Sequence, residues 1–373
     1  MKKILFIATV ESHIINFHIP FIRYFQEKGF EVHVATKLGS RQNELKEIEV
    51  VCHNVDFERS PYSASNIKAL RQLIAVMKNN KFSLVHVHTP VGGFLGRLAA
   101  KITNIRPVLY TAHGFHFYKG APLKNWLIYY NMERLAARWT DGLITMNEED
   151  YEAAKNLPLR NKNGVYKVHG VGVDLKRYFR EGHVRKQVRY ELGLKDDDIC
   201  ILTVAELIPN KNHLQLINAI EKVTQNSNIF CFFAGDGELK EKLKKYVKEK
   251  KMEHSIKFLG FRRDIPELLA ASDIFCLMSL REGLPRCIME AMAAGKPVIA
   301  TDVRGNRDLV QNGVNGILVP VNDVEATAKA IESLSCEEKL RQRMGKEGRR
   351  IIEDFSLEKV LMEMDEIYKI YLS

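Results

Sequence analysis

The segment Ser279-Leu-Arg-Glu-Gly-Leu-Pro-Arg-Cys-Ile-Met-Glu-Ala-Met-Ala-Ala-Gly-Lys-Pro-Val-Ile-Ala-Thr301 is the most informative stretch of this chain. Its pattern predicts the end of a strand, a loop, a helix over residues 285–294, a tight turn and a further strand. Pro285 suits the first helical turn, where its missing N–H costs no hydrogen bond. Gly283 lets backbone approach a ligand closely, and the free N–H groups of the helix start attract anions. The segment therefore predicts a phosphate or pyrophosphate site.

The same alternation of strand and helix extends outward through the whole chain. The predicted strands are Ile4–Ala8, Glu31–Ala35, Leu84–His88, Val108–Thr111, Leu143–Thr145, Ile199–Val204, Ile229–Ala234, Ile256–Leu259, Ile274–Leu277 and Val298–Ala300. The predicted helices include Asn66–Met77, Asn125–Arg138, Lys211–Val223 and Glu238–Lys250. Because the strands are apolar without alternation, the sheets should be parallel and covered on both faces.

A break in this rhythm at Gly170–Asp174 predicts two domains. We expect an α/β chain of two Rossmann-like doubly wound domains, residues 1–174 and 175–355, with ligands in the crevice between them at the carboxyl ends of the strands. A helical tail over Glu337–Tyr371 has apolar residues at three- and four-residue spacing, so one of its faces must be buried. We expect its last part, residues 356–373, to pack back on the first domain.

Composition excludes several classes of protein. The 373 residues are 46% hydrophobic and 27% charged, which is typical of a globular protein. The six cysteines are widely spaced without a C-x-x-C pair, which argues against a disulfide-rich module or a zinc ribbon and predicts a reducing cytoplasm. Met1–Val10 resembles a signal peptide, but its apolar part ends at Glu11, so it predicts a buried first strand. No apolar run reaches the ~18 residues that a membrane span needs.

Charge is unevenly distributed along the chain. Residues 1–180 hold 26 Lys and Arg against 15 Asp and Glu, a balance of 26 − 15 = +11, while the whole chain carries +10. A basic first half suits anionic partners such as phospholipid head groups, lipid phosphates or nucleic acid, although an ordinary solubilising surface is an equal alternative. No nucleic-acid recognition motif is visible, so we expect no nucleic-acid partner.

Glu282 and Glu290 are two carboxylates eight residues apart on the decisive segment. Along a helix they would be separated by ~12 Å. A general acid and base acting on one glycosidic bond need a separation of ~5–9.5 Å. The spacing instead suits two hydroxyl-rich groups that flank a diphosphate, as in a nucleotide sugar. If the two carboxylates are considered without the rest of the segment, a simpler alternative is that Glu282 is a solvated helix cap and Glu290 a surface residue of the helix.

Together these residues form an E-x7-E motif set in R-E-G-L-P-R-C-I-M-E-A-M-A-A-G-K-P-V-I-A, which closely resembles the retaining glycosyltransferases of family 4. The resemblance extends over essentially the whole chain. The other matching motifs are Val85-His-Val-His-Thr-Pro90, Gly92-Gly-Phe-Leu-Gly-Arg97, Thr111-Ala-His-Gly-Phe-His116, Gly170-Val-Gly-Val-Asp174, Phe233-Ala-Gly-Asp-Gly-Glu238 and Leu259-Gly-Phe-Arg262. Within the family the chain is most similar to bacterial enzymes of exopolysaccharide and capsule assembly. The resemblance implies the GT-B fold of two facing Rossmann-like domains.

The resemblance also implies roles for individual residues. Glu282 would contact the donor sugar and Glu290 the ribose, while the backbone amides of Gly283 and Leu284 would hold the diphosphate. The family's first-domain histidine matches His113, expected near the reacting sugar. The further donor-binding candidates are Gly235, Phe261 and Arg262, of which the last two match the segment that lines the nucleotide base.

One position departs from the family pattern. Many members carry an arginine and a lysine after the first strand of the second domain, both on the donor phosphates. Here Lys211 matches the lysine, but Glu206 occupies the position of the arginine. A carboxylate beside a pyrophosphate is repelled unless it is paired. Either another arginine replaces the missing phosphate contact, or the side chain of Glu206 points away from the diphosphate. The candidate arginines are Arg281, Arg286 and Arg304.

The histidines of the first domain do not predict a metal site. His86 and His88 share one strand face, and His113 and His116 lie in the next strand-end loop, but no carboxylate has a recognisable ligand spacing. We therefore expect neither a metal nor another cofactor. The first strand lacks G-x-G-x-x-G, which argues against an NAD(P) enzyme. It leads into a loop through Ser12 and His13, expected to face the cleft and to help bind acceptor or phosphate.

The sequence thus predicts a retaining, metal-independent glycosyltransferase that moves a hexose or N-acetylhexosamine from a nucleoside-diphosphate sugar. Family resemblance favours UDP as the nucleotide and a glycan or polyprenyl-diphosphate-linked acceptor. Lys211 would stabilise the charge of the leaving diphosphate. We expect a cytoplasmic protein that docks on the inner membrane face through its basic first domain. Two alternatives are a UDP-sugar epimerase of GT-B fold and a non-catalytic nucleotide-sugar-binding subunit.

Overall fold

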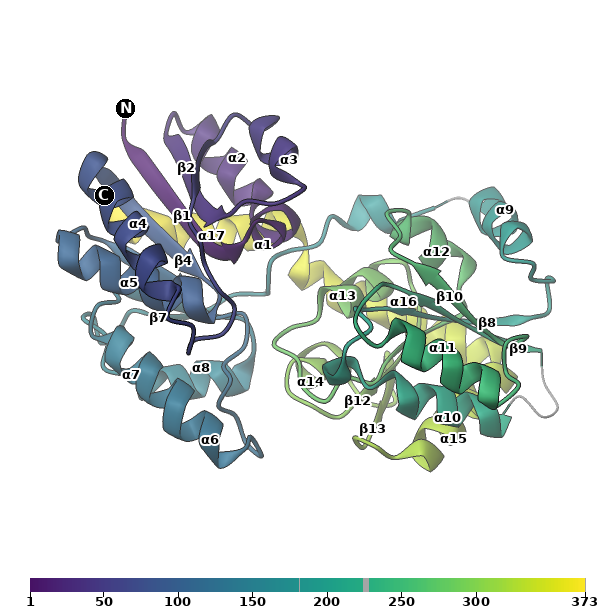
Figure 1. Cartoon of the computed structure of the whole chain (residues 1–373). Coiled ribbons are helices and arrows are strands. Elements are labelled where there is room, and N and C mark those ends of the chain that lie inside the picture. The colour runs from purple at the N-terminus through teal and green to yellow at the C-terminus, as the bar shows by residue number, and fades with distance from the viewer. Residues whose placement is uncertain (181, 224–227, 373) are drawn as a thin grey trace. The chain divides into compact units, whose positions relative to one another are not determined.

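Two parallel sheets form the framework of the chain in the computed structural model, which describes residues 1–180, 182–223 and 228–372 (Figure 1). Contacts divide the chain into two units, Met1–Val171 with Lys359–Ser373 as unit 1 and Gly172–Glu358 as unit 2. Every strand pairing in the two sheets over these described ranges is parallel. The predicted α/β class with two Rossmann-like domains is confirmed.

Unit 1 contains a sheet of order β3-β2-β1-β4-β5-β6-β7. Its strands are β1 (Lys3–Val10), β2 (Glu31–Lys37), β3 (Val51–Asn54), β4 (Phe82–His88), β5 (Val108–Thr111), β6 (Gly142–Thr145) and β7 (Val165–Lys167). Its helices are α1 (Glu11–Phe17), α2 (Ile19–Glu27), α3 (Gln42–Lys46), α4 (Asn66–Asn79), α5 (Pro90–Thr103), α6 (Leu123–Asn125), α7 (Asn131–Ala137), α8 (Glu148–Lys155) and most of α17 (Leu357–Leu372), with a π-helical turn at Trp126–Tyr130.

Unit 2 contains a sheet of order β10-β9-β8-β11-β12-β13. Its strands are β8 (Ile199–Val204), β9 (Ile229–Ala234), β10 (Ile256–Gly260), β11 (Ile274–Leu277), β12 (Val298–Thr301) and β13 (Gly316–Val319). Its helices are α9 (Gly182–Glu191), α10 (His213–Val223), α11 (Lys240–Glu249), α12 (Ile265–Ala271), α13 (Arg286–Ala293), α14 (Asn306–Leu309), α15 (Val324–Cys336) and α16 (Glu338–Ile352), with 3-10 turns at Leu175–Tyr178, Pro209–Lys211 and Glu353–Phe355.

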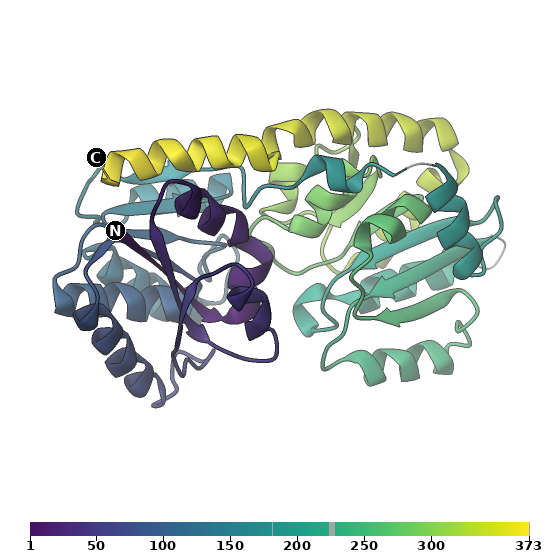
Figure 2. The ribbon, with the colours of Figure 1, turned by 90° about the horizontal axis from the view of Figure 1, so that it is seen from above.

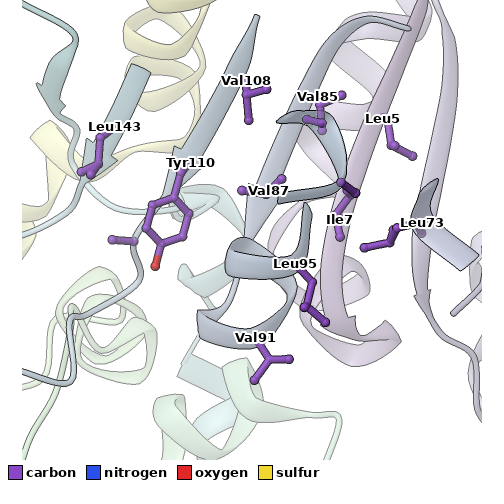
Figure 3. Packing of buried hydrophobic residues seen from close by; sticks show 14 of the residues in the cluster. Leu5, Ile7, Leu73, Val85, Val87, Val91, Leu95, Val108, Tyr110 and Leu143 are labelled. Atoms are coloured by element: carbon purple, nitrogen blue, oxygen red, sulfur yellow. The ribbon is translucent and has the colours of Figure 1, made fainter. Parts of the chain in front are cut away.

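Successive residues of each central strand are buried on opposite faces of the sheet, as the apolar runs predict. In unit 1, Leu5 and Ile7 join a core cluster with residues of α4 and α5 (Figure 3). Phe6, between them, packs on the other face against Phe25 of α2, with ring centroids 6.0 Å apart. In unit 2 the same alternation divides the buried strand residues between two core clusters.

The C-terminal helix α17 is packed in unit 1 from Lys359 onward, although its chain neighbours belong to unit 2. Figure 2 shows this yellow helix running along unit 1. Its anchor is Tyr368, which is 1% exposed and whose hydroxyl lies 3.0 Å from Nδ1 of His86 in the centre of β4. Tyr371 adds a hydrogen bond to the carbonyl of Asp141.

Three features differ from the sequence predictions. The helical tail predicted over Glu337–Tyr371 consists of two helices, because the turn Glu353–Phe355, which the pattern did not predict, separates α16 from α17. The segment through Ser12 and His13, expected as a loop, is the helix α1. Three strands were not predicted, namely β3, β7 and β13. Each is only three or four residues long and lies at a sheet edge, where partial exposure weakens the apolar signal.

A buried ion pair links α5 and α7 in unit 1. Arg97 is fully buried, its Nη2 lies 2.8 Å from Oε2 of Glu133, and its Nε donates to the carbonyl of Gly93 at 2.9 Å. Tyr110 donates to the other oxygen of Glu133 at 3.1 Å, and its ring lies under the guanidinium. Figure 3 shows Tyr110 among apolar side chains of the same core, and because Arg97 and Glu133 are both buried, the two charges depend on each other.

We expect Glu133→Gln to lower the free energy of unfolding of unit 1 by about 3–5 kcal/mol, because it leaves a buried guanidinium without its anion while conserving shape. Urea unfolding followed by circular dichroism measures the effect. Glu152→Gln is the matched control, since it removes the exposed partner of Lys155 and should cost less than about 1 kcal/mol. Equal midpoints for the two variants would contradict the assignment.

Candidate active site

Most of the predicted donor residues of unit 2 lie in loops at the carboxyl edge of its sheet, and Glu290 lies on α13. The strand order reverses between β8 and β11, and the loops that follow these two strands carry Lys211 and Glu282. In parallel α/β sheets such a switch point opens a crevice for ligands. Residues at the ends of neighbouring strands complete this edge; they are Gly235 after β9, and Phe261 and Arg262 after β10.

An ion pair joins the two loops at the switch point. Nζ of Lys211 lies 2.6 Å from Oε1 of Glu282, and the two side chains are 19% and 11% exposed. Burial by itself would lower the pKa of Lys211, but the adjacent carboxylate outweighs it and raises that pKa, so the ammonium stays charged. Asn210 supports the contact by donating to the carbonyl of Arg281 at 3.1 Å and by accepting from the N–H of Leu280 at 2.8 Å.

The loop before α13 is fixed by backbone packing. Arg304 donates from Nε to the carbonyl of Glu282 at 3.2 Å. Gly305 has a φ of +77°, and a Cβ there would lie 2.3 Å from the carbonyl oxygen of Gly283, so this turn requires glycine. Gly283 and Leu284 are half-buried and lie directly before Pro285, the N-cap of α13.

Glu290 is held on α13 by two partners. Its Oε1 accepts from the hydroxyl of Tyr178 at 2.6 Å and pairs with Nε of Arg286 at 3.0 Å. Because α13 begins at Arg286, Glu282 lies in the preceding loop and the ~12 Å helical spacing expected between the carboxylates does not apply. Tyr178 comes from a 3-10 turn more than a hundred residues away, and no local pattern in the sequence indicated its role.

The remaining donor candidates line the neighbouring strand ends. The N–H of Gly235 donates to the carbonyl of Gly260 at 2.8 Å, which joins the ends of β9 and β10. A Cβ at Gly235 would lie 1.9 Å from the carbonyl of Ala205, so only glycine fits there. Phe261 is 67% exposed, as a side chain available to stack on a ligand must be. Arg262 is paired with Asp264, whose carboxylate raises the pKa of the guanidinium.

Glu206, at the position where the family resemblance implies an arginine, has an exposed side chain. Its charge still reaches Lys211, where it is one of the influences that raise the pKa of the ammonium. Of the three arginines considered as substitutes, Arg286 pairs with Glu290 and Arg304 contacts the carbonyl of Glu282. Both therefore stand beside the predicted phosphate loop and contribute positive charge to it.

The unit 1 candidates gather at the corresponding edge of the other sheet, whose order reverses between β1 and β4. His13 lies on α1 directly after β1, and His113 follows β5. Their rings meet edge to face with centroids 4.4 Å apart. His88, which the sequence placed near His113, and His18, which the sequence did not indicate, complete a cluster in which one ring nitrogen of each lies within 4.8 Å of the others. Ser12 precedes His13 on α1.

Burial keeps these imidazoles neutral. It lowers the pKa of His13 to about 4, and it lowers the pKa of His18, His88 and His113 well below the usual range, reinforced by the neighbouring rings. The expectation of no metal rested on the absence of a carboxylate at a recognisable ligand spacing, and it stays a prediction. The tertiary structure adds His13 and His18 to His88 and His113 as groups that could bind an ion.

Comparison with known proteins identifies the family. The family model described as "Glycosyl transferases group 1" matches residues 184–351, and "Glycosyl transferase 4-like" matches residues 3–147. The chain is 40% identical to the "Putative glycosyltransferase EpsD" of Bacillus subtilis, over 100% of this chain and 97% of that protein. The chain belongs to the family 4 glycosyltransferases. As expected from the sequence, its relatives include proteins of bacterial polysaccharide synthesis, such as the capsular glycosyltransferase CapM of Staphylococcus aureus, 26% identical over 100% of this chain and 98% of that protein.

Another relative of this family 4 glycosyltransferase has a named reaction. It is the Escherichia coli "UDP-Gal:alpha-D-GlcNAc-diphosphoundecaprenol alpha-1,3-galactosyltransferase", 31% identical over 86% of this chain and 82% of that protein. Among solved structures, Anabaena Alr3699/HepE in complex with UDP-glucose has a TM-score of 0.84 at 21% identity and covers 99% of this chain and 100% of that one. This structural likeness supports the GT-B fold.

The buried histidines make the stability of unit 1 dependent on pH. An unfolded histidine binds a proton near pH 6.5, whereas a ring with its pKa at about 4 stays neutral. The free energy of unfolding of unit 1 is therefore at its full value above pH 6.5. It decreases as the pH falls toward 4, by about 1.4 kcal/mol per pH unit for each such histidine. We expect His18→Gln to reduce this slope by one histidine's share. Urea unfolding at a series of pH values measures it, and the exposed His254→Gln in unit 2 is the control.

An unchanged slope in a folded His18→Gln variant would contradict the assignment. The test compares slopes, so a constant loss of stability caused by the substitution does not affect it.

Proposed function

We propose that this chain transfers a hexose or N-acetylhexosamine from a UDP-sugar to a polyprenyl-diphosphate-linked glycan, with retention at the anomeric carbon and without a metal in the transfer. The observation that carries the proposal is the Lys211–Glu282 pair at the switch point of unit 2, next to the loop Gly283–Leu284. It combines a cation for a diphosphate with a carboxylate for sugar hydroxyls. The E. coli relative named for UDP-Gal and a diphosphoundecaprenol-linked acceptor supports the choice of substrates.

The charges of the site fit this reaction. During transfer the bond between the anomeric carbon and the diphosphate oxygen breaks, and UDP leaves with the electron pair. Lys211 and the backbone amides before α13 stabilise the negative charge that develops on the leaving group. The acceptor hydroxyl attacks from the same face and passes its proton to the departing phosphate. When the donor is bound, the ion pair between Glu282 and Lys211 is partly replaced by contacts of Glu282 with sugar hydroxyls. Glu290 binds the ribose.

The reaction itself is the first test. Purified protein is incubated with UDP-, GDP- and ADP-sugars, with and without a polyprenyl-diphosphate-linked glycan, in the presence of EDTA. We expect acceptor-dependent release of UDP and a product of retained anomeric configuration. Consumption of a UDP-sugar without acceptor would favour the epimerase alternative, and binding without turnover would favour the non-catalytic subunit.

Within that assay we expect Lys211→Met to lower kcat by about 10²–10³, because it removes the cation at the leaving group. Glu290→Gln should raise the KM for the donor about tenfold to hundredfold and leave kcat closer to wild type. Lys222→Met is the control, since this exposed lysine pairs with Glu325 and lies in the last turn of α10, at the other end of that helix from Lys211, and should leave both constants unchanged. Near-normal kcat in Lys211→Met would contradict the proposed role.

We further propose that unit 1 docks on an anionic membrane through its segment 119–138, as the acceptor class requires. Leu123 and Leu127 are 73% and 62% exposed, next to the partly exposed Trp126. The segment carries four exposed cations, and its acidic residue, Glu133, is buried against Arg97; the cations are Lys119, Lys124, Arg134 and Arg138. Apolar tips among cations fit a headgroup region. None of the described helices is long and apolar enough to span a bilayer.

We expect the double variant Leu123→Ser, Leu127→Ser to bind anionic vesicles at least about tenfold more weakly than wild type, because two inserted side chains are lost. Vesicle sedimentation at two salt concentrations measures the binding, which should also weaken as salt rises. Tyr190→Ser is the control, because Tyr190 is 86% exposed but lies in unit 2. Binding unaffected by the double variant would place the contact elsewhere.

A further inference from the structure

His13, His18, His88 and His113 form a four-histidine cluster. A single histidine near the reacting sugar would not need three further histidines around it. One ring nitrogen from each residue lies within 4.8 Å of the others. Three of the Nε2 atoms, those of His13, His18 and His88, are buried and have no hydrogen-bond partner among the described residues. His113 adds a weak contact, with its Nε2 3.4 Å from Nδ1 of His88.

Buried nitrogens without partners are unfavourable, and each requires an explanation. A ring nitrogen without a partner loses its hydrogen bond to water on folding and gains nothing in return. Three such atoms in one place indicate a missing common partner. The neighbouring His86 shows the contrast, because its two nitrogens lie within hydrogen-bond distance of Tyr368 and Thr111.

We propose that the four-histidine cluster binds a divalent late transition metal ion of the Zn²⁺ type, held by four imidazoles. Four nitrogen ligands match tetrahedral zinc coordination. The absence of a carboxylate from the cluster disfavours Mg²⁺ and Ca²⁺, which require oxygen ligands. The burial that keeps these rings neutral also leaves a lone pair on each for the metal.

The geometry requires only a local adjustment. With Zn–N bonds of ~2.0–2.1 Å, tetrahedral nitrogens are ~3.4 Å apart, so separations of up to 4.8 Å have to close by at most roughly 1.4 Å. The rings of His18 and His88 are stacked with centroids 3.8 Å apart and have to turn. A cavity of about 10 Å³, lined in part by these two rings, leaves space beside them. His13 and His113 are partly exposed within unit 1, which gives the ion access.

A site closed by four protein ligands has no open position for a substrate. The ion is therefore not a participant in the proposed metal-free transfer. Because His113 is the histidine that we place near the reacting sugar, an ion in the cluster would occupy its nitrogen and inhibit transfer. This consequence rests on the proposed function, whereas metal binding itself does not.

The test measures binding without any nucleotide sugar. Metal-free protein is titrated with Zn²⁺ by calorimetry and with Co²⁺ by visible absorption, where four-coordinate Co²⁺ gives intense bands. We expect one ion per chain, and we expect His13→Gln and His18→Gln each to weaken binding at least about tenfold. Circular dichroism and urea unfolding confirm that each variant is folded, and His13→Gln, at a partly exposed position, is the safer of the two.

The matched control is His53→Gln. His53 and His33 form a second histidine pair in unit 1, with ring nitrogens 2.9 Å apart and Glu31 beside them, but they lie outside the four-histidine cluster. We expect His53→Gln to bind Zn²⁺ and Co²⁺ as wild type does. Binding that is lost in His53→Gln and kept in His18→Gln would overturn the proposal, as would the absence of any Co²⁺ bands.

A second measurement separates this inference from the proposed function. The ratio of transferase activity with and without a slight excess of Zn²⁺ is determined within each variant, and we expect inhibition in wild type that EDTA reverses. In His18→Gln the ratio should return to near one. Absence of transfer under every condition would count against the proposed function while leaving the calorimetric result intact. Metal binding without inhibition would confine the site to a structural role.

Discussion

The pairing of β8 with β11 and of β1 with β4 is the constraint on which both candidate sites depend. In a parallel sheet, all strands end at one edge, and the order reverses where helices pass to opposite faces. The loops on the two sides of that reversal diverge and leave their polar groups without a strand to pair with. In unit 2 these loops carry Lys211 and Glu282, and in unit 1 the chain there enters α1 with His13.

The two units use this common geometry with opposite electrostatics. In unit 2 a largely buried ion pair keeps charged groups at the sheet edge. The carboxylate of Glu282 keeps Lys211 protonated despite its burial. In unit 1 burial suppresses charge, and the clustered imidazoles remain neutral. A charged edge favours a diphosphate, whereas neutral nitrogens favour a metal ion or a sugar hydroxyl. The same fold therefore offers chemically distinct sites in its two halves.

The C-terminal helix α17 packs beside the strand that carries part of the histidine cluster. Tyr368 fills the unit 1 core beside His86, and the Phe25 ring lies 4.6 Å from it by centroids. His88, two residues further along the same strand, is fully buried and lines a small cavity together with Met364 and Tyr368 of α17. The last helix of the chain thus helps to bury His88, and this burial keeps the imidazole neutral.

The sequence by itself determined the fold class and the central strands, because apolar runs and turn residues are local signals. It also predicted a phosphate loop before α13 and site roles for Glu282, Glu290 and Lys211, and these predictions likewise came from short local patterns. Only the tertiary structure decided which groups meet: Tyr178 on Glu290, and His18 and His88 beside His113. These contacts join residues tens to more than a hundred positions apart. The physical reason is that spacing along a chain fixes direction within one element, whereas the approach of separate elements depends on how the sheet and its covering helices pack.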